Sequence, residues 1–257
     1  MQGVEIVDKL LGGIPEETYL NPSLDNSKRN AGRLFFLRVC DRSLYDENLG
    51  WITAIVSHTH VYHKGSYLEP PPLKLLSWKR LPNVGRETHT YLLHIIDHYD
   101  IFPEVTVFLQ ADNSHKSCRF FTRPPMNYVY DVKGMTSLSV ACPKASSSME
   151  WKRIHHILKW QNRLKTGEMR RARLTFELSK TLFGFQNPPE VYYCPGGCFA
   201  ATRDMIRKYS LDFYRKAIKY VDDHDNPEEG ITLRGSGVRC FHKPKTRVHG
   251  CQTSINS

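Results

Sequence analysis

The chain has 257 residues, of which 40% are hydrophobic and 24% charged, and its formal net charge is +10. This is ordinary globular composition, with enough apolar material for one sizeable core and no apolar run near the roughly 20 residues that span a bilayer. The seven cysteines are irregularly spaced and the first 30 residues lack a secretory pattern, so we expect reduced thiols rather than a disulfide framework. These features predict a cytoplasmic protein that does not associate with membranes.

The first half of the chain predicts alternating strands and helices. Residues 1–31 are polar and turn-rich, and we interpret them as a leader or covering segment. Periodicity then predicts five elements, and their β-α-β-α-β order favours a parallel sheet covered by helices. They are a strand at Leu34–Cys40, a short helix at Asp41–Trp51, a strand region at Ile52–Tyr62, a helix at Arg86–Tyr99 and a strand at Val105–Gln110.

The second half is less regular. We expect helical character in 150–165, a loop in 181–193, a tight turn at 195–197, a short apolar segment at 198–201 and one or two helices in 203–222. With the first half these form a single α/β domain over 32–233, followed by a basic tail at 234–257.

Part of the positive charge is concentrated between Lys152 and Arg173, which contains eight basic residues and one acid. A localised basic zone is typical of proteins with a phosphate-rich partner. The alternative is an ordinary solvated basic helix. The candidate nucleic-acid contacts are Lys152, Arg153, Lys159, Arg163, Arg170, Arg171 and Arg173.

Ligands of open parallel α/β sheets bind beyond the carboxyl ends of the strands. Three loops qualify: the one after Cys40, the one from Lys64 to Arg86, and Gln110 to His115. In the last, Gln110, Asp112 and His115 follow an apolar strand, as active-site residues do, although an ordinary surface turn remains the alternative.

The predicted helix at Arg86 begins with polar residues. Helix N-termini bind anions through free N–H groups, Arg86 is able to hold a phosphate or carboxylate, and Glu87 is able to act as a base or bind an amine. The simpler interpretation is helix capping by Asn83, with Glu87 favourable to the helix dipole.

Histidines and cysteines do not predict a metal site. His58, His60 and His63, and the helical pair His94 and His98, lack partners at a recognised ligand spacing, so surface or hydrogen-bonded histidines are the favoured interpretation. Gly196 and Gly197 predict a tight turn that lines a pocket, and Cys198 is a weak candidate for a nucleophile. Walker A, G-x-G-x-x-G and G-x-S-x-G motifs are absent, and no cofactor is expected.

Several blocks together resemble an uncharacterised-domain family common in fungi. They cover roughly residues 34–233, and the spacing of the first four is specific. The blocks are 45–51 (Tyr-Asp-Glu-Asn-Leu-x-Trp), 60–65 (His-Val-Tyr-His-Lys-Gly), 83–92 (Asn-Val-Gly-Arg-Glu-x-His-Thr-Tyr-Leu), 102–110, 195–200 and 226–230 (Asn-Pro-Glu-Glu-Gly).

The resemblance implies a GT-A-like fold, a mixed and mostly parallel sheet flanked by helices, because the family is distantly similar to GT-A glycosyltransferases. Some fungal members are arginine-containing cyclodipeptide synthases, which join an arginyl and a second aminoacyl group from charged tRNAs into a diketopiperazine. Aminoacyl-tRNA is then the expected partner. Glu87, His89, Asp112 and His115 become the expected catalytic residues. The expected substrate-binding residues are Asn83, Arg86, Tyr91, Gln110, Gly196, Gly197, Cys198, Glu228 and Glu229.

Two other functions stay open. A nucleotide-sugar-dependent glycosyltransferase explains the element order equally well, although its metal-dependent form needs an Asp-x-Asp element where this chain has Gln110-Ala111-Asp112. An RNA- or phosphate-binding module is less well supported, because aromatic stacking motifs in a known RNA-binding arrangement are missing.

The tail departs from the family. Members usually continue the 226–230 block with Glu-Arg-Leu-Trp and an apolar stretch, whereas here Leu233 precedes a segment with five bases and no acid. Suitable codons for this segment, read in an adjacent frame, give the family-like ending. We hypothesise that residues 234–257 are frame-shifted relative to the family. Sequencing the transcript across codon 233 tests this, and an unshifted frame in every relative would refute it.

Overall fold

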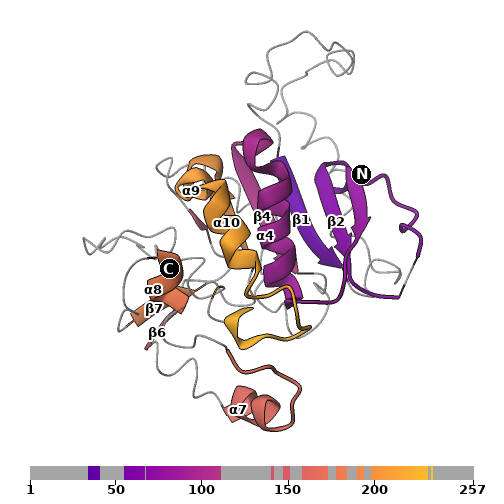
Figure 1. Cartoon of the computed structure of the whole chain (residues 1–257). Coiled ribbons are helices and arrows are strands. Elements are labelled where there is room, and N and C mark those ends of the chain that lie inside the picture. Colours follow the sequence, from indigo (N-terminus) through magenta and orange to yellow (C-terminus); the bar gives the residue numbers. More distant parts are fainter. Residues whose placement is uncertain are drawn as a thin grey trace, which may run out of the picture.

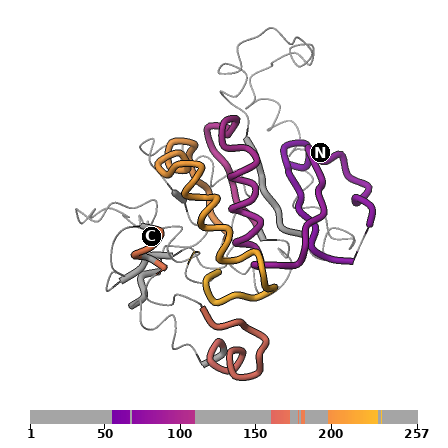
Figure 2. The backbone as a smooth tube through the Cα atoms, viewed as in Figure 1, coloured from indigo at the N-terminus to yellow at the C-terminus, as the bar shows by residue number. Residues whose placement is uncertain are grey.

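The fold is known from a computed structural model, shown as a cartoon in Figure 1 and as a backbone tube in Figure 2. The structure describes residues 34–40, 55–66, 68–110, 140–141, 147–150, 158–172, 178–183, 190–193, 198–230 and 233.

The centre of the described fold is a mixed six-stranded sheet with the order β3-β2-β1-β4-β8-β5. The first four strands of this order run parallel to one another, and β8 pairs antiparallel with both β4 and β5. The strands are β3 (Ser77–Arg80), β2 (Thr59–His63), β1 (Leu34–Cys40), β4 (Val105–Gln110), β8 (Phe199–Thr202) and β5 (Val140–Ala141).

Strands β1 and β4 form the middle of this sheet, as their apolar sequences predict. Leu34 lies opposite Val105, and Val39 lies opposite Gln110. Near-continuous apolar strands are typical of parallel sheets with both faces covered. The prediction of an α/β fold with a mostly parallel sheet is therefore confirmed.

Helix α4 (Arg86–His98), followed by the short 3-10 turn η4 (Tyr99–Ile101), lies along one face of the sheet, and α10 (Leu211–Ile218) lies beside it (Figure 1). The predicted helix at Arg86–Tyr99 is thus confirmed. The region 203–222 forms two helices, α9 (Arg203–Arg207) and α10, which begin at the capping side chains of Thr202 and Ser210.

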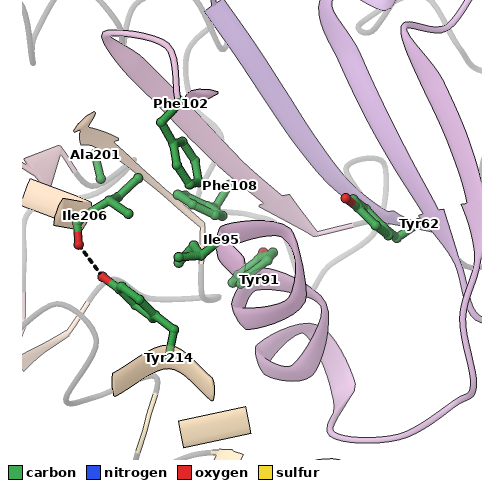
Figure 3. Close-up of a cluster of buried hydrophobic side chains, with 8 residues drawn as sticks. All are labelled: Tyr62, Tyr91, Ile95, Phe102, Phe108, Ala201, Ile206 and Tyr214. Atoms are coloured by element: carbon green, nitrogen blue, oxygen red, sulfur yellow. Dashed lines mark hydrogen bonds between the residues drawn. The ribbon is translucent and has the colours of Figure 1, made fainter. Parts of the chain in front are cut away.

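The main core cluster fills the space between these helices and the sheet (Figure 3). Tyr91 from α4 meets Phe108 of β4 edge-on at 5.2 Å, and Tyr214 from α10 donates a hydrogen bond of 2.6 Å to the backbone oxygen of Ile206. The buried members are Tyr62, Tyr91, Ile95, Phe102, Phe108, Ala201, Ile206 and Tyr214.

Further elements are α7 (Leu158–Lys165), α8 (Leu178–Phe183) and a second, two-stranded antiparallel sheet of β6 (Ser147–Glu150) and β7 (Glu190–Tyr193). Several predicted boundaries are therefore wrong. The expected helix at 150–165 is confirmed over 158–165, where α7 lies, but Glu150 is the last residue of β6, and 151–157 lie outside the described residues. The expected loop at 181–193 contains the end of α8 and all of β7.

Two more predictions need correction near β2. The strand starts at Thr59, because Val56–His58 forms the 3-10 turn η3. The expected loop from Lys64 to Arg86 contains β3, whose side chains are mostly exposed. A short polar edge strand lacks the apolar alternation that predicts strands, so the sequence pattern missed it.

None of the described helices is long and apolar enough to cross a membrane. The predicted segments at 1–31, 41–51 and 234–257 lie outside the described residues.

Candidate functional site

The candidate site lies where the parallel strands end. Strands β1, β2 and β3 run in the same direction as β4, so their carboxyl ends share one edge of the sheet. Helix α4 starts six residues after β3 ends, which places its first turn at this edge. Lys64 directly follows β2. The edge is where open parallel sheets bind ligands.

The start of α4 has an unusual backbone. Gly85 and Arg86 both have positive φ, 61° and 49°. A Cβ on Gly85 would lie 2.1 Å from the backbone oxygen of Val221, so only glycine fits here. The amides of Gly85 and Arg86 donate to the backbone oxygens of His224 and Asp225 at 2.7 and 3.1 Å.

This arrangement replaces the capping that the sequence suggested. Gly85 is the N-cap residue, with no capping side chain, and Asn83 is exposed two residues before it. The backbone of the loop after α10 therefore satisfies donors at the start of the helix that a capping side chain usually satisfies.

Lys64 is the residue that sequence reasoning missed. Its Nζ donates to the backbone oxygens of Val84 and Arg86, both at 2.5 Å. Burial lowers the pKa of Lys64 to about 7, and the nearby Glu87 carboxylate opposes that shift. Its place directly after a strand, at the carboxyl edge of the sheet, was the signal that could have identified it.

Glu87 and His89 lie in the first turn of α4 and are 8% and 7% exposed. Burial, together with the smaller effect of the Lys64 charge, lowers the pKa of His89 to about 4. His89 is therefore a neutral imidazole near pH 7, and its buried Nδ1 has no hydrogen-bond partner among the described residues. The site thus joins an acid, an amine that titrates near neutrality and a neutral imidazole.

Arg86 and Asn226 connect two blocks that are far apart in the sequence. The Nη1 of Arg86 donates to Oδ1 of Asn226 at 3.3 Å, and Nδ2 of Asn226 donates to the backbone oxygen of Glu168 at 2.8 Å. The predicted ligand-binding role of Arg86 stays a prediction, but its guanidinium helps to hold the 226–230 segment against α4.

Glu228 and Glu229 have internal roles that differ from the predicted ones. The Arg170 guanidinium pairs with Glu229 and with Asp223, each at 3.1 Å, and Glu229 is fully buried. Oε2 of Glu228 accepts a hydrogen bond of 2.8 Å from the backbone amide of Ala172. These contacts attach the 168–172 strip to the 220–230 segment, so Arg170 is engaged inside the protein rather than presented to nucleic acid.

The other predicted basic contacts are only partly described. Arg163 lies 3.7 Å from Glu168, and Arg171 is exposed, as is Lys165, which was not among the predicted contacts. The backbone of Lys159 lies in α7. Lys152, Arg153 and Arg173 lie outside the described residues.

Two other predicted substrate residues belong to the interior. Tyr91 is part of the main core, and Cys198 is 1% exposed just before β8. Gln110 is the last residue of β4, at the expected edge. Asp112, His115, Gly196 and Gly197 lie outside the described residues.

The structure also brings together histidines that the sequence keeps apart. The rings of His60 from β2 and His94 and His98 from α4 have centroids 4.3–5.2 Å from one another. Within the described part of the chain, no group of three or more His, Cys, Asp or Glu side chains has a geometry that could hold a metal ion.

Comparison with known proteins gives a family but no activity. No curated protein and no solved structure matches the chain. Residues 42–235, most of the chain, match a family described as a protein of unknown function, DUF3431. This range includes β2, α4, the 226–230 segment and therefore the whole candidate site. The chain belongs to the DUF3431 family.

Proposed function

We propose that the chain is a tRNA-dependent, arginine-containing cyclodipeptide synthase, which joins an arginyl and a second aminoacyl group into a diketopiperazine. The observation that carries this proposal is the buried Glu87 carboxylate at the carboxyl edge of the sheet, beside Lys64 and His89. A carboxylate in a secluded position is the natural partner of an arginine guanidinium.

The positions of the predicted acids favour this residue. Glu228 binds the Ala172 amide and Glu229 pairs with Arg170, so both have internal partners. Asp112 lies outside the described residues. Among the described candidates, Glu87 is the one placed at the ligand-binding edge.

The reaction needs positioning more than activation, because the aminoacyl ester of a charged tRNA is already reactive. The α-amine of one aminoacyl group attacks the ester carbonyl of the other, an amide bond forms, and the tRNA hydroxyl leaves with the proton that the amine loses. A second attack of the same kind closes the ring. His89 is neutral and able to hydrogen-bond to the attacking amine. Exposed Lys165 and Arg171 are suited to contact tRNA phosphates.

Sugar transfer is the second candidate, favoured by the mixed, mostly parallel sheet with flanking helices. Such a sheet is the arrangement expected of a GT-A-like nucleotide-sugar glycosyltransferase, although a shared fold alone does not establish an activity. Strand β4 ends at Gln110, where a metal-dependent member would place its Asp-x-Asp element. The chain therefore fits a glycosyltransferase that works without a metal ion better than a metal-dependent one.

A mass spectrum of metabolites from a heterologous host that expresses the full chain tests the proposal. We expect a new ion of cyclo(arginyl-X), reduced about 100-fold or more in Glu87→Gln, which keeps the shape of the side chain but removes its charge. The matched control is Glu104→Gln, because Glu104 is exposed before β4, and it should leave the ion unchanged.

Two outcomes would count against the proposal. If a folded, full-length protein yields no such ion and hydrolyses a nucleotide sugar instead, the function is sugar transfer. If Glu87→Gln retains full product formation, Glu87 does not hold the arginyl group.

A further inference from the structure

We propose that α10, the end of α7 and the 168–172 strip together form a docking surface for the phosphate backbone of RNA, next to the candidate site. The surface consists of four exposed basic side chains, which we call the junction bases: Lys165, Arg171, Lys216 and Lys219. That the RNA is a charged tRNA rests on the proposed function. The docking of phosphates rests on the contacts and charges of these segments.

The strip meets the chain just after α10 ends (Figure 2). The Arg170 guanidinium donates to the backbone oxygen of Tyr220 at 3.3 Å, and the backbone of Arg170 pairs with that of Pro227. Arg171 therefore lies beside the end of α10, where Lys219 directly precedes Tyr220. Basic residues that are far apart in the sequence are thus brought to one junction.

The junction bases differ from their basic neighbours in being unpaired. Within the described part of the chain, none of the four forms an ion pair. The neighbouring bases instead neutralise most of the acids that would repel phosphate. These ion pairs join Arg170 to Asp223 at 3.1 Å, Arg163 to Glu168 at 3.7 Å, and Arg215 to Asp212 at 3.3 Å.

The loop that follows α10 adds two exposed acids to this surface. Asp225 contacts His224 at 3.0 Å, and Asp222 is exposed shortly after Tyr220. The four junction bases outnumber these two acids, so the surface keeps an excess of positive charge that attracts a polyanion. Because Asp222 repels phosphates, removing it should act in the opposite direction to removing a base.

The composition of the surface favours RNA over a membrane or an acidic protein. Every exposed residue of α10 is charged, whereas helices that lie on membranes need apolar residues to insert. The large exposed hydrophobic residues of the described chain, Leu68, Leu76 and Ile101, belong to other segments. Protein interfaces are depleted of lysine, but a phosphate backbone is bound by exposed bases alone.

The junction is connected to the start of α4 by two hydrogen bonds. Nδ2 of Asn226 donates to the backbone oxygen of Glu168 at 2.8 Å, and Oδ1 of Asn226 accepts from Arg86 at 3.3 Å. Glu87 directly follows Arg86 in the first turn of the helix. An RNA held by the junction bases thus lies beside the proposed binding site of the arginyl group, as an aminoacyl-tRNA must.

Fluorescence anisotropy of the full chain with a labelled RNA hairpin tests this. The probe has about 12 base pairs and a single-stranded 3′ CCA end, like the acceptor arm of a tRNA. The affinity should fall about 100-fold between 50 mM and 200 mM NaCl, because four phosphate contacts give a slope of about −3.6 for log K against log salt concentration. Binding without salt dependence would overturn the inference, as would a folded protein that does not bind the probe.

Two double variants test the two sides of the junction. Lys216→Gln/Lys219→Gln should lower the affinity at 50 mM NaCl about tenfold or more and make the salt slope shallower by about 2, since each phosphate contact contributes about 0.9. Lys165→Gln/Arg171→Gln should lose a similar amount, and the quadruple variant should bind with almost no salt dependence. These side chains are exposed, so the fold should be unaffected, which urea denaturation checks.

Two controls separate this surface from net charge. Lys74→Gln/Lys79→Gln removes the same charge from exposed lysines at the β3 edge of the sheet and should leave the affinity within about twofold. Asp222→Asn should raise the affinity about two- to threefold. If the control at β3 loses as much affinity as the junction variants, binding follows net charge alone and the assignment of the surface is wrong.

The remaining outcomes separate the inference from its rivals. Tighter binding to phosphatidylserine vesicles than to the hairpin, lost in Lys216→Gln/Lys219→Gln, would replace RNA by a membrane and overturn the inference. RNA binding through the junction bases without any cyclodipeptide would leave the inference standing and refute the proposed reaction. Cyclodipeptide formation that survives the loss of all four bases unchanged would do the reverse.

Discussion

The two halves of α4 are buried by different means. In the first turn, charged and polar groups meet backbone atoms: Lys64 contacts two carbonyl oxygens, and the loop at 224–225 accepts from the helix start. In the second half, side-chain rings pack against one another instead. His60, His94 and His98 lie against one another, and Phe102 and Phe108 meet the ring of His94 edge-on at 5.6 and 6.3 Å.

The difference shows how a mostly polar helix is held on a sheet. Of its seven buried residues, only Tyr91 and Ile95 are apolar or aromatic without a basic ring. A polar group that is buried without a partner costs about 1–3 kcal/mol, so each half needs its own compensation. Contacts with backbone oxygens and charge compensate the half at the candidate site, and contacts between imidazole and aromatic rings compensate the other.

The largest effect is expected from Gly85→Ala, which disturbs the hydrogen bonds between the start of α4 and the backbone of the loop at 224–225. A Cβ there would lie 2.1 Å from the oxygen of Val221 and 2.6 Å from Cβ of His89, at a φ of 61°. Strain at positive φ and forced displacement of the backbone each cost about 1–3 kcal/mol. We expect the free energy of unfolding, measured by urea denaturation, to fall by about 3 kcal/mol or more.

Gly167→Ala is the matched control. Gly167 also has a positive φ, 76°, but no heavy atom lies within 4 Å of an added Cβ. The cost should be limited to backbone strain, about 1–2 kcal/mol. Equal losses in the two variants would show that the contact with Val221 contributes little.

The ring-stacked half should respond to acid. Burial lowers the pKa of His60 to about 4 and that of His94 well below its usual value, and the charge of His98 adds to both shifts. The unfolded chain binds these protons near pH 6.5 and the folded chain does not, so stability is present above pH 6.5 and declines as the pH falls towards 4. For His60 alone the loss amounts to about 3 kcal/mol at pH 4.

Urea denaturation at pH 7, 6 and 5 measures this decline. His94→Phe, which cannot titrate, should make the free energy of unfolding less dependent on pH in this range. His58→Gln, a change outside the ring cluster, is the control and should leave the dependence unchanged. If the free energy of unfolding of His94→Phe depends on pH as steeply as that of the wild type, groups elsewhere account for the acid sensitivity.

The same contrast explains what the sequence could and could not predict. The ranges of β1 and β4 and the start of α4 followed from apolar runs and helical periodicity. The position of Glu87 near the carboxyl ends of the parallel strands followed from the predicted order of strands and helices. These features depend on local pattern, which a single sequence displays.

Features that depend on distant partners were missed. Nothing in the pattern around Lys64 shows that its amine meets the carbonyl oxygens of Val84 and Arg86 some 20 residues later. Glu229 was expected to bind substrate. Its actual pairing with Arg170 joins segments 59 residues apart, which the sequence pattern does not show. Contacts of this kind arise only when tertiary packing brings the segments together.

The smallest effect is expected from Lys79→Met, which tests whether charge matters in the ring-stacked half. Lys79 of β3 pairs with Asp97 of α4 at 3.1 Å, and the two side chains are 54% and 33% exposed. Exposed ion pairs contribute about 0.2–1 kcal/mol and are screened by salt. Urea denaturation should therefore show a loss within that range, which disappears in 1 M NaCl. A larger loss that persists in salt would mean that the stem of Lys79 packs against the helix, and that the second half of α4 relies on the β3 edge as well as on its histidine rings.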